Sequence, residues 1–294
     1  MNARLISLAL LLPLFSAAAD FRVVGYLPEY RVARLQQLPT KLLTDLILFA
    51  IAPSPEGKIE ASDRILAILP KLPRHENLRL HICIGGWAKS ANFASVTADS
   101  AKRSRLVAAL LTFCQTHRLH GVDVDWEFPR GPEQIANFAA FLRELRSALH
   151  LHHKQVSAAI AYHQTFSPEV YLLADYWHLM SYDNSGRHAS YTHSVDHINS
   201  QRLAGLPRER LCLGLPFYGR NLKDREAYSY ADIARLHAPA PEIDEIAGIA
   251  FNNVATIRRK VELARGRRLA GVMIWELGQD SPDHRLLRST VQTP

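Results

Sequence analysis

The chain has 294 residues, of which 48% are hydrophobic and 21% are charged, and its formal net charge is +7. This is ordinary globular composition, and the length suffices for one large α/β domain with a substantial core. The three cysteines exclude a disulfide framework. No nucleic-acid-binding motif accompanies the basic charge. This charge would therefore attract an anionic cell-wall or membrane surface rather than a nucleic acid.

The first 19 residues have the features of a secretory signal peptide. Arg4 supplies a positive start, residues 5–15 form an apolar core, and the alanines at 17–19 provide a small-residue cleavage site. A transmembrane anchor is the alternative, but about 11–15 apolar residues are short for spanning a bilayer. We therefore expect a signal peptide at 1–19, a catalytic domain at 20–294 with no integral membrane segment, and a secreted or periplasmic location.

Eight short apolar or β-branched runs follow, separated by helix-like stretches. Residues 100–117 and 132–149 carry apolar side chains at helical spacing, and the segments SPEV and SYTHSV each offer a Ser or Thr cap before a further helix. The runs are FRVVGY from residue 21, TDLILFAIA from 44, LRLHICIGG from 78, GVDVDWE from 121, QVSAAIAY from 155, YWHLMSYD from 176, RLCLGLPFYG from 210 and LAGVMIWE from 269.

This alternation of strands and helices favours parallel strands joined by right-handed crossovers. Eight such units predict a single α/β domain folded as a (β/α)8 TIM barrel. A doubly wound open sheet is the competing fold, but no Gly-rich dinucleotide turn follows the first run. In a barrel, catalytic groups gather at the carboxyl ends of the strands. The unusual residues fall there: Gly85, Gly86, Trp87, Asp123, Asp125, Glu127, Tyr182, Asp183, Tyr218, Trp275 and Glu276.

The fourth run places three carboxylates at alternate positions. Asp123, Asp125 and Glu127 would share one strand face, roughly 6–7 Å apart, with Glu127 nearest the rim. Close carboxylates do not all ionise, so the group should retain the proton that a general acid needs. Loop capping or buried ion pairs are the alternative, but no Arg or Lys lies within the motif.

These acids come from one strand, and none stands out as a nucleophile on the other side of a glycosidic bond. Ordinary glycosidases use two opposed carboxyl groups, whereas in the substrate-assisted class the 2-acetamido carbonyl of the sugar attacks the anomeric carbon. The run GVDVDWEFP closely resembles the signature of the family-18 glycoside hydrolases, the chitinase-like (β/α)8 enzymes. CIGGW, MSYD, GLPFYGR and MIWELGQD resemble the motifs of that family's third, sixth, seventh and eighth strands, and the resemblance covers residues 21–288 in order.

The resemblance implies a role for each matching residue. Glu127 resembles the proton donor that later acts as a base toward water, and Asp125 the partner that holds the acetamido N–H. Asp123 would exchange a proton or hydrogen bond with Asp125, and Tyr182 would donate to the acetamido oxygen. The implied substrate-binding residues are Trp275 as the apolar floor, Met180 and Asp183 in the sugar site, Tyr26 as support for the deep aspartate, and Trp87 and Tyr218. Core packing is the alternative for Met180, Tyr26 and Trp275.

Three departures from the family pattern are visible. His120 replaces the first Asp of the signature, and Cys83 replaces the Ser of the third-strand motif, which gives a poorer hydrogen-bond partner. The stretch from 221 to 268 is short for the α+β insertion of many chitinases, so we expect no large inserted domain. In this stretch Arg258, Arg259, Lys260, Arg265, Arg267 and Arg268 predict a solvated basic helix face.

The expected function is hydrolysis of β-1,4 linkages in polymers of N-acetylglucosamine, namely chitin or chito-oligosaccharides. Peptidoglycan or N-glycan cleavage is an alternative, as is a non-catalytic glycan-binding protein, although the presence of Glu127 argues against the last. We expect no cofactor, no metal and no nucleic-acid partner, and a monomer. The three cysteines are predicted to be buried thiols, and the histidines at 150–153 to lie in a surface loop away from the rim.

Overall fold

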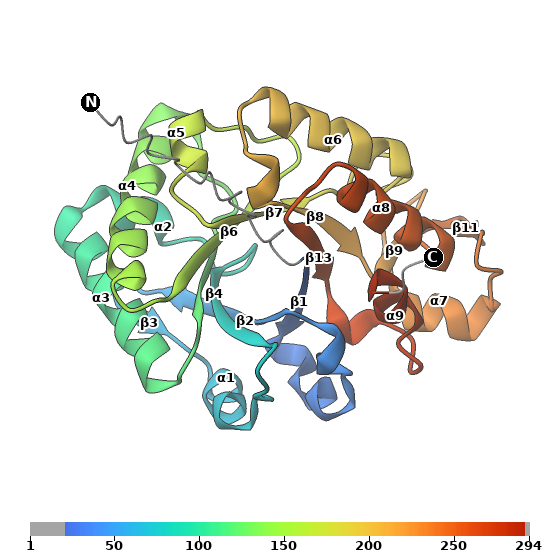
Figure 1. Cartoon of the computed structure of the whole chain (residues 1–294), viewed down its shortest axis with the longest axis horizontal. Helices are drawn as coiled ribbons and strands as arrows, with labels where there is room; N and C mark the ends of the chain where they lie inside the picture. Colours follow the sequence, from blue (N-terminus) through green and yellow to red (C-terminus); the bar gives the residue numbers. More distant parts are fainter. Residues whose placement is uncertain (1–20, 292–294) are drawn as a thin grey trace, which may run out of the picture.

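In the computed structural model, which describes residues 21–291, eight parallel strands form a closed barrel surrounded by helices (Figure 1). The strand order is β1-β13-β8-β7-β6-β5-β4-β2, and β1 also pairs with β2, which closes the ring. The expected single (β/α)8 domain is confirmed; the expected signal peptide lies outside the described residues. The barrel strands are β1 (Arg22–Pro28), β2 (Asp45–Pro53), β4 (Arg79–Gly85), β5 (Gly121–Asp125), β6 (Gln155–Ala161), β7 (Tyr176–Met180), β8 (Leu211–Pro216) and β13 (Gly271–Trp275).

The helices agree closely with the apolar periodicity of the sequence. The two predicted at 100–117 and 132–149 are α3 (Ser100–Thr116) and α4 (Gly131–His150), and the Ser190 side chain caps the next long helix by accepting from the His193 N–H. Ser167 makes no such cap at α5, which has only one turn. Within residues 21–291 no helix is long and apolar enough to cross a membrane. The others are α1 (Asp63–Ile68), α2 (Phe93–Ala98), α5 (Pro168–Tyr171), α6 (Tyr191–Leu203), α7 (Tyr230–His237), α8 (Val254–Gly266), α9 (Arg285–Val291), and the 3-10 helices η1 (Glu29–Gln37), η2 (Thr40–Leu42), η3 (Leu69–Lys71), η4 (Arg208–Arg210) and η5 (Leu277–Gln279).

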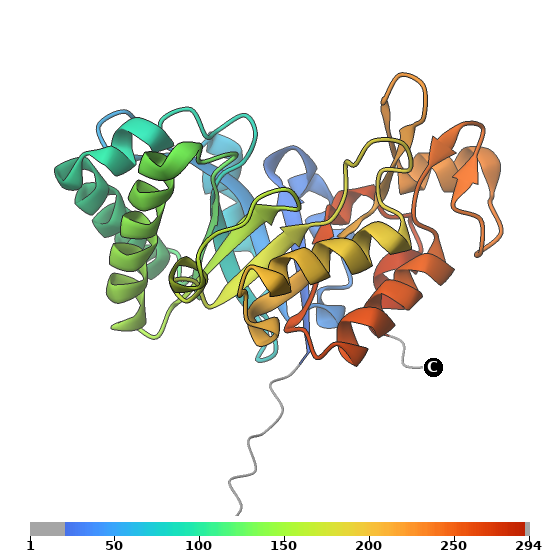
Figure 2. The ribbon, with the colours of Figure 1, turned by 90° about the horizontal axis from the view of Figure 1, so that it is seen from above.

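The chain between β8 and α8 forms a small unit rather than a large inserted domain. Four short strands make an antiparallel sheet in the order β10-β9-β12-β11, and α7 lies between its second and third strands in sequence. Figure 2 shows this unit to one side of the barrel. Its strands are β9 (Tyr218–Asn221), β10 (Ala227–Ser229), β11 (Glu245–Ile246) and β12 (Ile249–Ala250); the remaining strand, β3 (Ile59–Glu60), pairs antiparallel with β2.

Strand alternation divides β5 into two chemically different faces. Val122, Val124 and Trp126 belong to the apolar layer between the sheet and the helices, where the Trp126 ring stacks on Phe93 at a centroid distance of 5.3 Å. Asp123 and Asp125 take the other side, because successive side chains of a strand point to opposite faces. Both are buried. The hydrophobic layer therefore fixes the register that directs the acids into the barrel.

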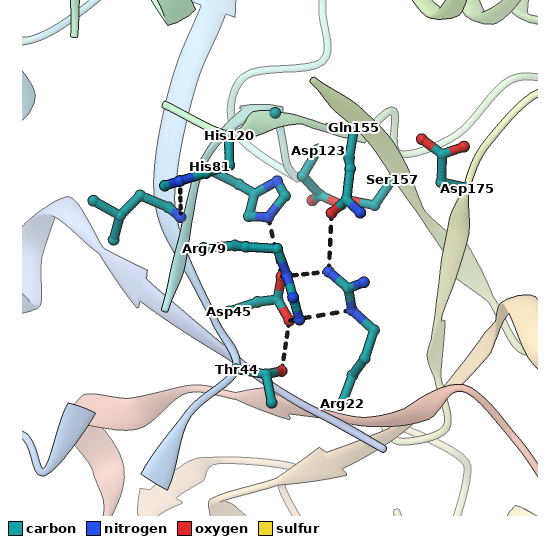
Figure 3. Close-up of polar contacts among 12 residues, drawn as sticks. Arg22, Thr44, Asp45, Arg79, His81, His120, Asp123, Gln155, Ser157 and Asp175 are labelled. Atoms are coloured by element: carbon teal, nitrogen blue, oxygen red, sulfur yellow. Dashed lines mark hydrogen bonds and ion pairs between the residues drawn. The ribbon is translucent and has the colours of Figure 1, made fainter. Parts of the chain in front are cut away.

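The amino-terminal end of the barrel is closed by a charged cluster around Asp45 (Figure 3). The Asp45 carboxylate accepts from Arg22, from Arg79 Nε at 2.9 Å, from Thr44 Oγ1 at 2.6 Å and from His81 Nε2 at 3.1 Å. Burial by itself raises the pKa of Asp45, but the hydrogen bond from His81 and the two arginines hold it well below the usual range. Asp45 is therefore an ionised carboxylate in the barrel interior.

The prediction of a solvated basic helix face is wrong for Lys260. Lys260 lies on the inner side of α8 and is fully buried, with its Nζ donating to the Ala189 carbonyl and to Asn252 Oδ1, each at 2.7 Å. Burial lowers the pKa of Lys260 to about 7. The number of basic residues on α8 does not reveal this burial, because Lys260 lies on the same face of the helix as the buried Ile257, Val261 and Ala264.

Cysteine and histidine positions agree with the expected buried thiols and surface loop. Cys83, Cys114 and Cys212 are free and buried. His150 is the last residue of α4, and His152 and His153 follow it. His150 Nε2 lies 2.9 Å from Asp175 Oδ2, just before β7 begins, so these histidines lie at the end of the barrel away from the predicted site. Within residues 21–291, no group of three or more His, Cys, Asp or Glu side chains could hold a metal ion.

Candidate active site

The carboxyl ends of the barrel strands surround a cavity of about 420 Å³. Most residues that the sequence indicated for the site line it. Two exceptions are Asp123, which lies beneath the cavity and is hydrogen-bonded to Tyr26, and Tyr218, which packs beside Tyr182. The other exceptions are Gly85 and Gly86, which lie against the Asp125 carbonyl, and Glu276, which is buried and paired with Arg31. The topology thus brings the predicted residues that line the cavity together from five barrel strands, β1, β4, β5, β7 and β13, and the loops after them. The lining residues are Tyr26, Trp87, Asp125, Glu127, Ala159, Met180, Tyr182, Asp183, Arg220, Met273 and Trp275.

Asp123 is the deepest of the three acids and is completely buried. Its Oδ1 accepts from Ser157 Oγ at 2.6 Å and lies 3.1 Å from His178 Nδ1, while its Oδ2 accepts from the Tyr26 hydroxyl at 2.7 Å. Burial alone raises the pKa of Asp123, but His178 and these hydrogen bonds outweigh burial and lower it. Asp123 is therefore held as a carboxylate.

Asp125 and Glu127 have the opposite electrostatic character. Asp125 Oδ1 is buried with no hydrogen-bond partner among the described residues. Burial, together with the charges of Glu127 and Asp123, raises the pKa of Asp125 well above the usual range. Burial and the charge of Asp183 raise the pKa of Glu127 to about 7, although the Trp87 N–H donates to it. This pair retains a proton near neutral pH. Crowding of the acids contributes at Asp125, but burial is the largest cause at both residues, and the charge that acts on Glu127 is that of Asp183.

The loop after β4 positions the rim of the site. The prediction of a strand through residue 127 is wrong for its last two residues, because β5 ends at Asp125. There the Asp125 carbonyl accepts from the Gly86 N–H at 2.6 Å and from Ser90 Oγ at 3.2 Å, and the Glu127 N–H donates to Ser90 Oγ at 2.9 Å. Gly85 has φ +109°, and a Cβ there would lie 2.2 Å from the Asp125 carbonyl oxygen. Only glycine permits this approach.

The end of β7 places Tyr182 and Asp183 on the opposite side of the cavity. The Tyr182 ring is buried beside Tyr218, with a centroid distance of 6.1 Å. Asp183 accepts from Arg220 Nε at 2.8 Å and from Arg220 Nη2 at 3.0 Å. Burial raises the pKa of Asp183, but hydrogen bonds from His188 and Arg220 prevail and lower it below the usual range. Asp183 is therefore an ion-paired carboxylate.

Two tryptophans provide aromatic surface to the cavity. Trp275, at the end of β13, is held edge-on by Phe49 at 4.7 Å and by Tyr26 at 5.7 Å between ring centroids. Trp87 is 79% exposed, and its ring meets Phe128 edge-on at 6.5 Å. One aromatic face thus lies inside the cavity, and the other at its entrance. Aromatic faces of this kind pack well against the C–H groups of sugar rings.

Comparison with known proteins decides the family. The model of the glycosyl hydrolases family 18 matches residues 22–280. The chain belongs to this family. The resemblance carried by the strand motifs is thereby confirmed.

Relatives of this family-18 chain include chitinases from several kingdoms. It is 24% identical over 276 residues to chitinase 1 of Aphanocladium album and 26% identical over 275 residues to probable chitinase 2 of Drosophila melanogaster, alignments that cover 74% and 70% of this chain. The chain spans 65% and 57% of the length of these two relatives. Among solved structures, the chitinase ChiB of Flavobacterium johnsoniae has a TM-score of 0.82 at 26% identity, with 92% of this chain and 93% of that chain covered. A Cycas revoluta chitinase in complex with (GlcNAc)4 has a TM-score of 0.81 at 22% identity, with 92% and 98% covered, which shows the same fold.

The structure adds residues to the site that sequence reasoning missed. Arg220 lines the cavity and pairs with Asp183, and its signal was available because it stands two positions after Tyr218 in the motif GLPFYGR. Ser157 and His178 contact Asp123 from the two strands that follow β5. No local pattern marks these two contacts, since they depend on the register of β5, β6 and β7.

Proposed function

We propose that this family-18 chain is a secreted glycoside hydrolase that cleaves β-1,4 linkages next to N-acetylglucosamine in chitin or chito-oligosaccharides. The observation that carries the proposal is Glu127 in the lining of the cavity, with its pKa raised to about 7. A carboxylic acid with this pKa still holds its proton at neutral pH and can deliver it to a leaving oxygen. The chitinase names of the relatives support the substrate class.

The nucleophile in this proposal is the 2-acetamido oxygen of the sugar itself. Besides Glu127, two carboxyl groups among residues 21–291 line the cavity, those of Asp125 and Asp183. Asp183 is engaged by Arg220, and the raised pKa of Asp125 keeps it protonated, so neither is suited to form a covalent bond to the sugar. The acetamido carbonyl attacks the anomeric carbon instead, as in the substrate-assisted exception to the two-carboxylate rule.

The reaction then proceeds in two steps with retained configuration. As the acetamido oxygen bonds to the anomeric carbon, the bond to the leaving oxygen breaks and Glu127 supplies the proton. Asp125 accepts from the acetamido N–H through a carboxyl oxygen and so keeps the oxazolinium ring in place, and Tyr182 donates to the acetamido oxygen. In the second step Glu127, now a carboxylate, takes a proton from water as that water attacks the anomeric carbon and opens the ring.

The remaining cavity residues bind the sugar. Trp275 forms an apolar floor beneath the reacting ring, and Met180 and Asp183 line the space beside it. The exposed Trp87 offers a face to a sugar on the leaving side. Tyr26 contributes indirectly, through its hydrogen bond to Asp123. Tyr218 also does not line the cavity; its ring packs beside that of Tyr182.

Product analysis tests the substrate class. Purified protein is incubated in parallel with chitin oligosaccharides, peptidoglycan and an N-glycan, and the products are identified by mass spectrometry. We expect release of short N-acetylglucosamine oligosaccharides from the chitin series, inhibited by a thiazoline that mimics the bound intermediate. The net charge of +7 mildly favours an acidic wall polymer. Faster cleavage of peptidoglycan than of chitin oligosaccharides would show that peptidoglycan is the preferred substrate. Binding without cleavage of any of the three would indicate a glycan-binding protein instead.

The pH dependence of kcat/KM follows from the state of Glu127. The acid must be protonated in the free enzyme, and its pKa is about 7. We therefore expect kcat/KM to fall about tenfold per pH unit above neutrality. The measurement uses a soluble chitin oligosaccharide between about pH 4 and about pH 9, with circular dichroism at each pH to exclude unfolding. A rate that stays constant to the alkaline end would contradict this assignment of the acid.

A further inference from the structure

Three leucines are exposed at the amino-terminal end of the barrel, away from the candidate active site. Leu203, the last residue of α6, is 89% exposed, and Leu151, directly after α4, is 81% exposed. They are the two most exposed large apolar side chains of residues 21–291. Leu172, directly after α5, is 50% exposed. A single exposed leucine is ordinary, but several on one face of a protein mark an interaction surface.

The chain topology puts these leucines on one face. Each of them ends or follows a helix and precedes a barrel strand, and the three strands concerned, β6, β7 and β8, are neighbours in the sheet. Side chains join the segments before these strands. His150 Nε2 lies 2.9 Å from Asp175 Oδ2, and Arg210 Nη1 donates to the Ala174 carbonyl at 2.6 Å. The leucines therefore belong to a continuous surface.

Arginines surround a groove on the same face. The groove, of about 470 Å³, lies between the ends of α6 and α8 and is lined by Arg202, Arg208, Arg267 and Arg268. Within the described part of the chain, no carboxylate forms an ion pair with Arg202, Arg267 or Arg268, and Arg208 has only Glu209, at 4.0 Å. The groove is therefore strongly positive. We call the three leucines and these four arginines the basal face.

The combination of exposed leucines and unpaired arginines fits an anionic lipid surface. Leucine side chains enter the boundary between headgroups and acyl chains, while arginines remain beside the headgroup phosphates. A polyanion without lipid would contact the arginines but gain nothing from the leucines. The neighbouring Asp175 opposes this attraction little, because it is paired with Arg146 and His150. The net charge of +7 adds attraction at longer range.

We propose that the basal face binds the protein peripherally to the surface of an anionic bilayer. The candidate active site lies at the carboxyl ends of the strands, so it is directed away from the lipid and stays open to a substrate. Only side chains enter the bilayer, and none of the residues of the basal face lines the active-site cavity. The proposal therefore holds or fails independently of the reaction that the cavity performs.

Vesicle sedimentation tests the role of charge. Purified protein is mixed with vesicles of phosphatidylcholine alone, or of phosphatidylcholine and phosphatidylglycerol in equal parts. We expect much stronger binding to the anionic vesicles, weakened by added salt. Arg208→Glu combined with Arg268→Glu should lower this binding at least about tenfold, since each arginine near an anionic surface attracts it. Equal binding of the wild type to both kinds of vesicle would overturn the proposal.

A matched variant separates the basal face from net charge. Lys223→Glu combined with Arg235→Glu changes two exposed residues of the small antiparallel unit and alters the net charge by the same amount. This control should bind anionic vesicles within about threefold of the wild type, because screening limits the reach of distant charges. An equal loss in both double variants would refute a localised surface.

The leucines distinguish a bilayer from other polyanions. Leu151→Ser combined with Leu203→Ser should lower binding to the anionic vesicles at least about tenfold at every salt concentration, because apolar burial is lost. Leu222→Ser combined with Leu236→Ser, in the small unit, is the control and should bind like the wild type. All variants keep the same chain ends, and melting temperatures verify folding. If the Leu151/Leu203 variant bound as tightly as the wild type, the face would recognise a polyanion and not a lipid surface.

Discussion

Glu127→Gln should lower kcat on chitin oligosaccharides by roughly 10²–10⁴-fold, the range expected for loss of a general acid. The amide has nearly the same shape as the acid, so it keeps the contact with the cavity but has no proton to deliver to the leaving oxygen. The hydrogen bond from the Glu127 N–H to Ser90 involves only the backbone of Glu127 and remains. KM and the melting temperature should therefore stay close to the wild-type values.

A matched variant separates catalysis from general damage. Glu29 lies directly after β1, is partly buried and pairs with Lys89 at 2.9 Å, but it does not line the cavity. Glu29→Gln should keep kcat within about twofold, as most surface substitutions have small effects. Initial rates of both variants are measured on the same oligosaccharide at the wild-type pH optimum. If Glu127→Gln turned over at nearly the wild-type rate, Glu127 would not be the acid.

The barrel could be predicted from the sequence because its strands are covered on both sides. Parallel strands with a filled interior and an outer layer of helices appear as nearly continuous apolar runs, and the helix of 20 residues shows a clear apolar stripe. The location of the site could be predicted from the same pattern, since the carboxyl ends of barrel strands meet at one rim. Alternation within the strand accounts for the shared face of Asp123 and Asp125, whereas Glu127 lines the cavity although β5 ends two residues before it.

The features that escaped prediction depend on contacts between distant segments. Whether β5 continues to Glu127 or stops at Asp125 is decided by Gly86 and Ser90, which lie in the loop after β4 and make the hydrogen bonds at this point. The burial of Lys260 depends on the Ala189 carbonyl, which is offered by the loop before α6. The contact between Asp123 and His178 depends on the register of β5 and β7. None of these partners is visible in a local window of sequence.

Removing the acetyl group from the reacting sugar should reduce kcat/KM by at least about 10³-fold, because an intramolecular nucleophile of high effective molarity is lost. The enzyme has no ready substitute for that nucleophile, since Asp183 is paired with Arg220 and Asp125 keeps its proton. The modified oligosaccharide should still bind, through Trp275 and the neighbouring sugars, and should act as a competitive inhibitor.

The most direct measurement compares two chitin oligosaccharides that differ only at the unit whose bond is broken, one with a 2-acetamido group and one with a free amine. A third oligosaccharide, deacetylated at a distant unit, controls for the loss of ordinary binding contacts. We predict rapid cleavage of the first and third and almost none of the second. Cleavage of all three at similar rates would show that the protein supplies the nucleophile, which would contradict substrate-assisted catalysis.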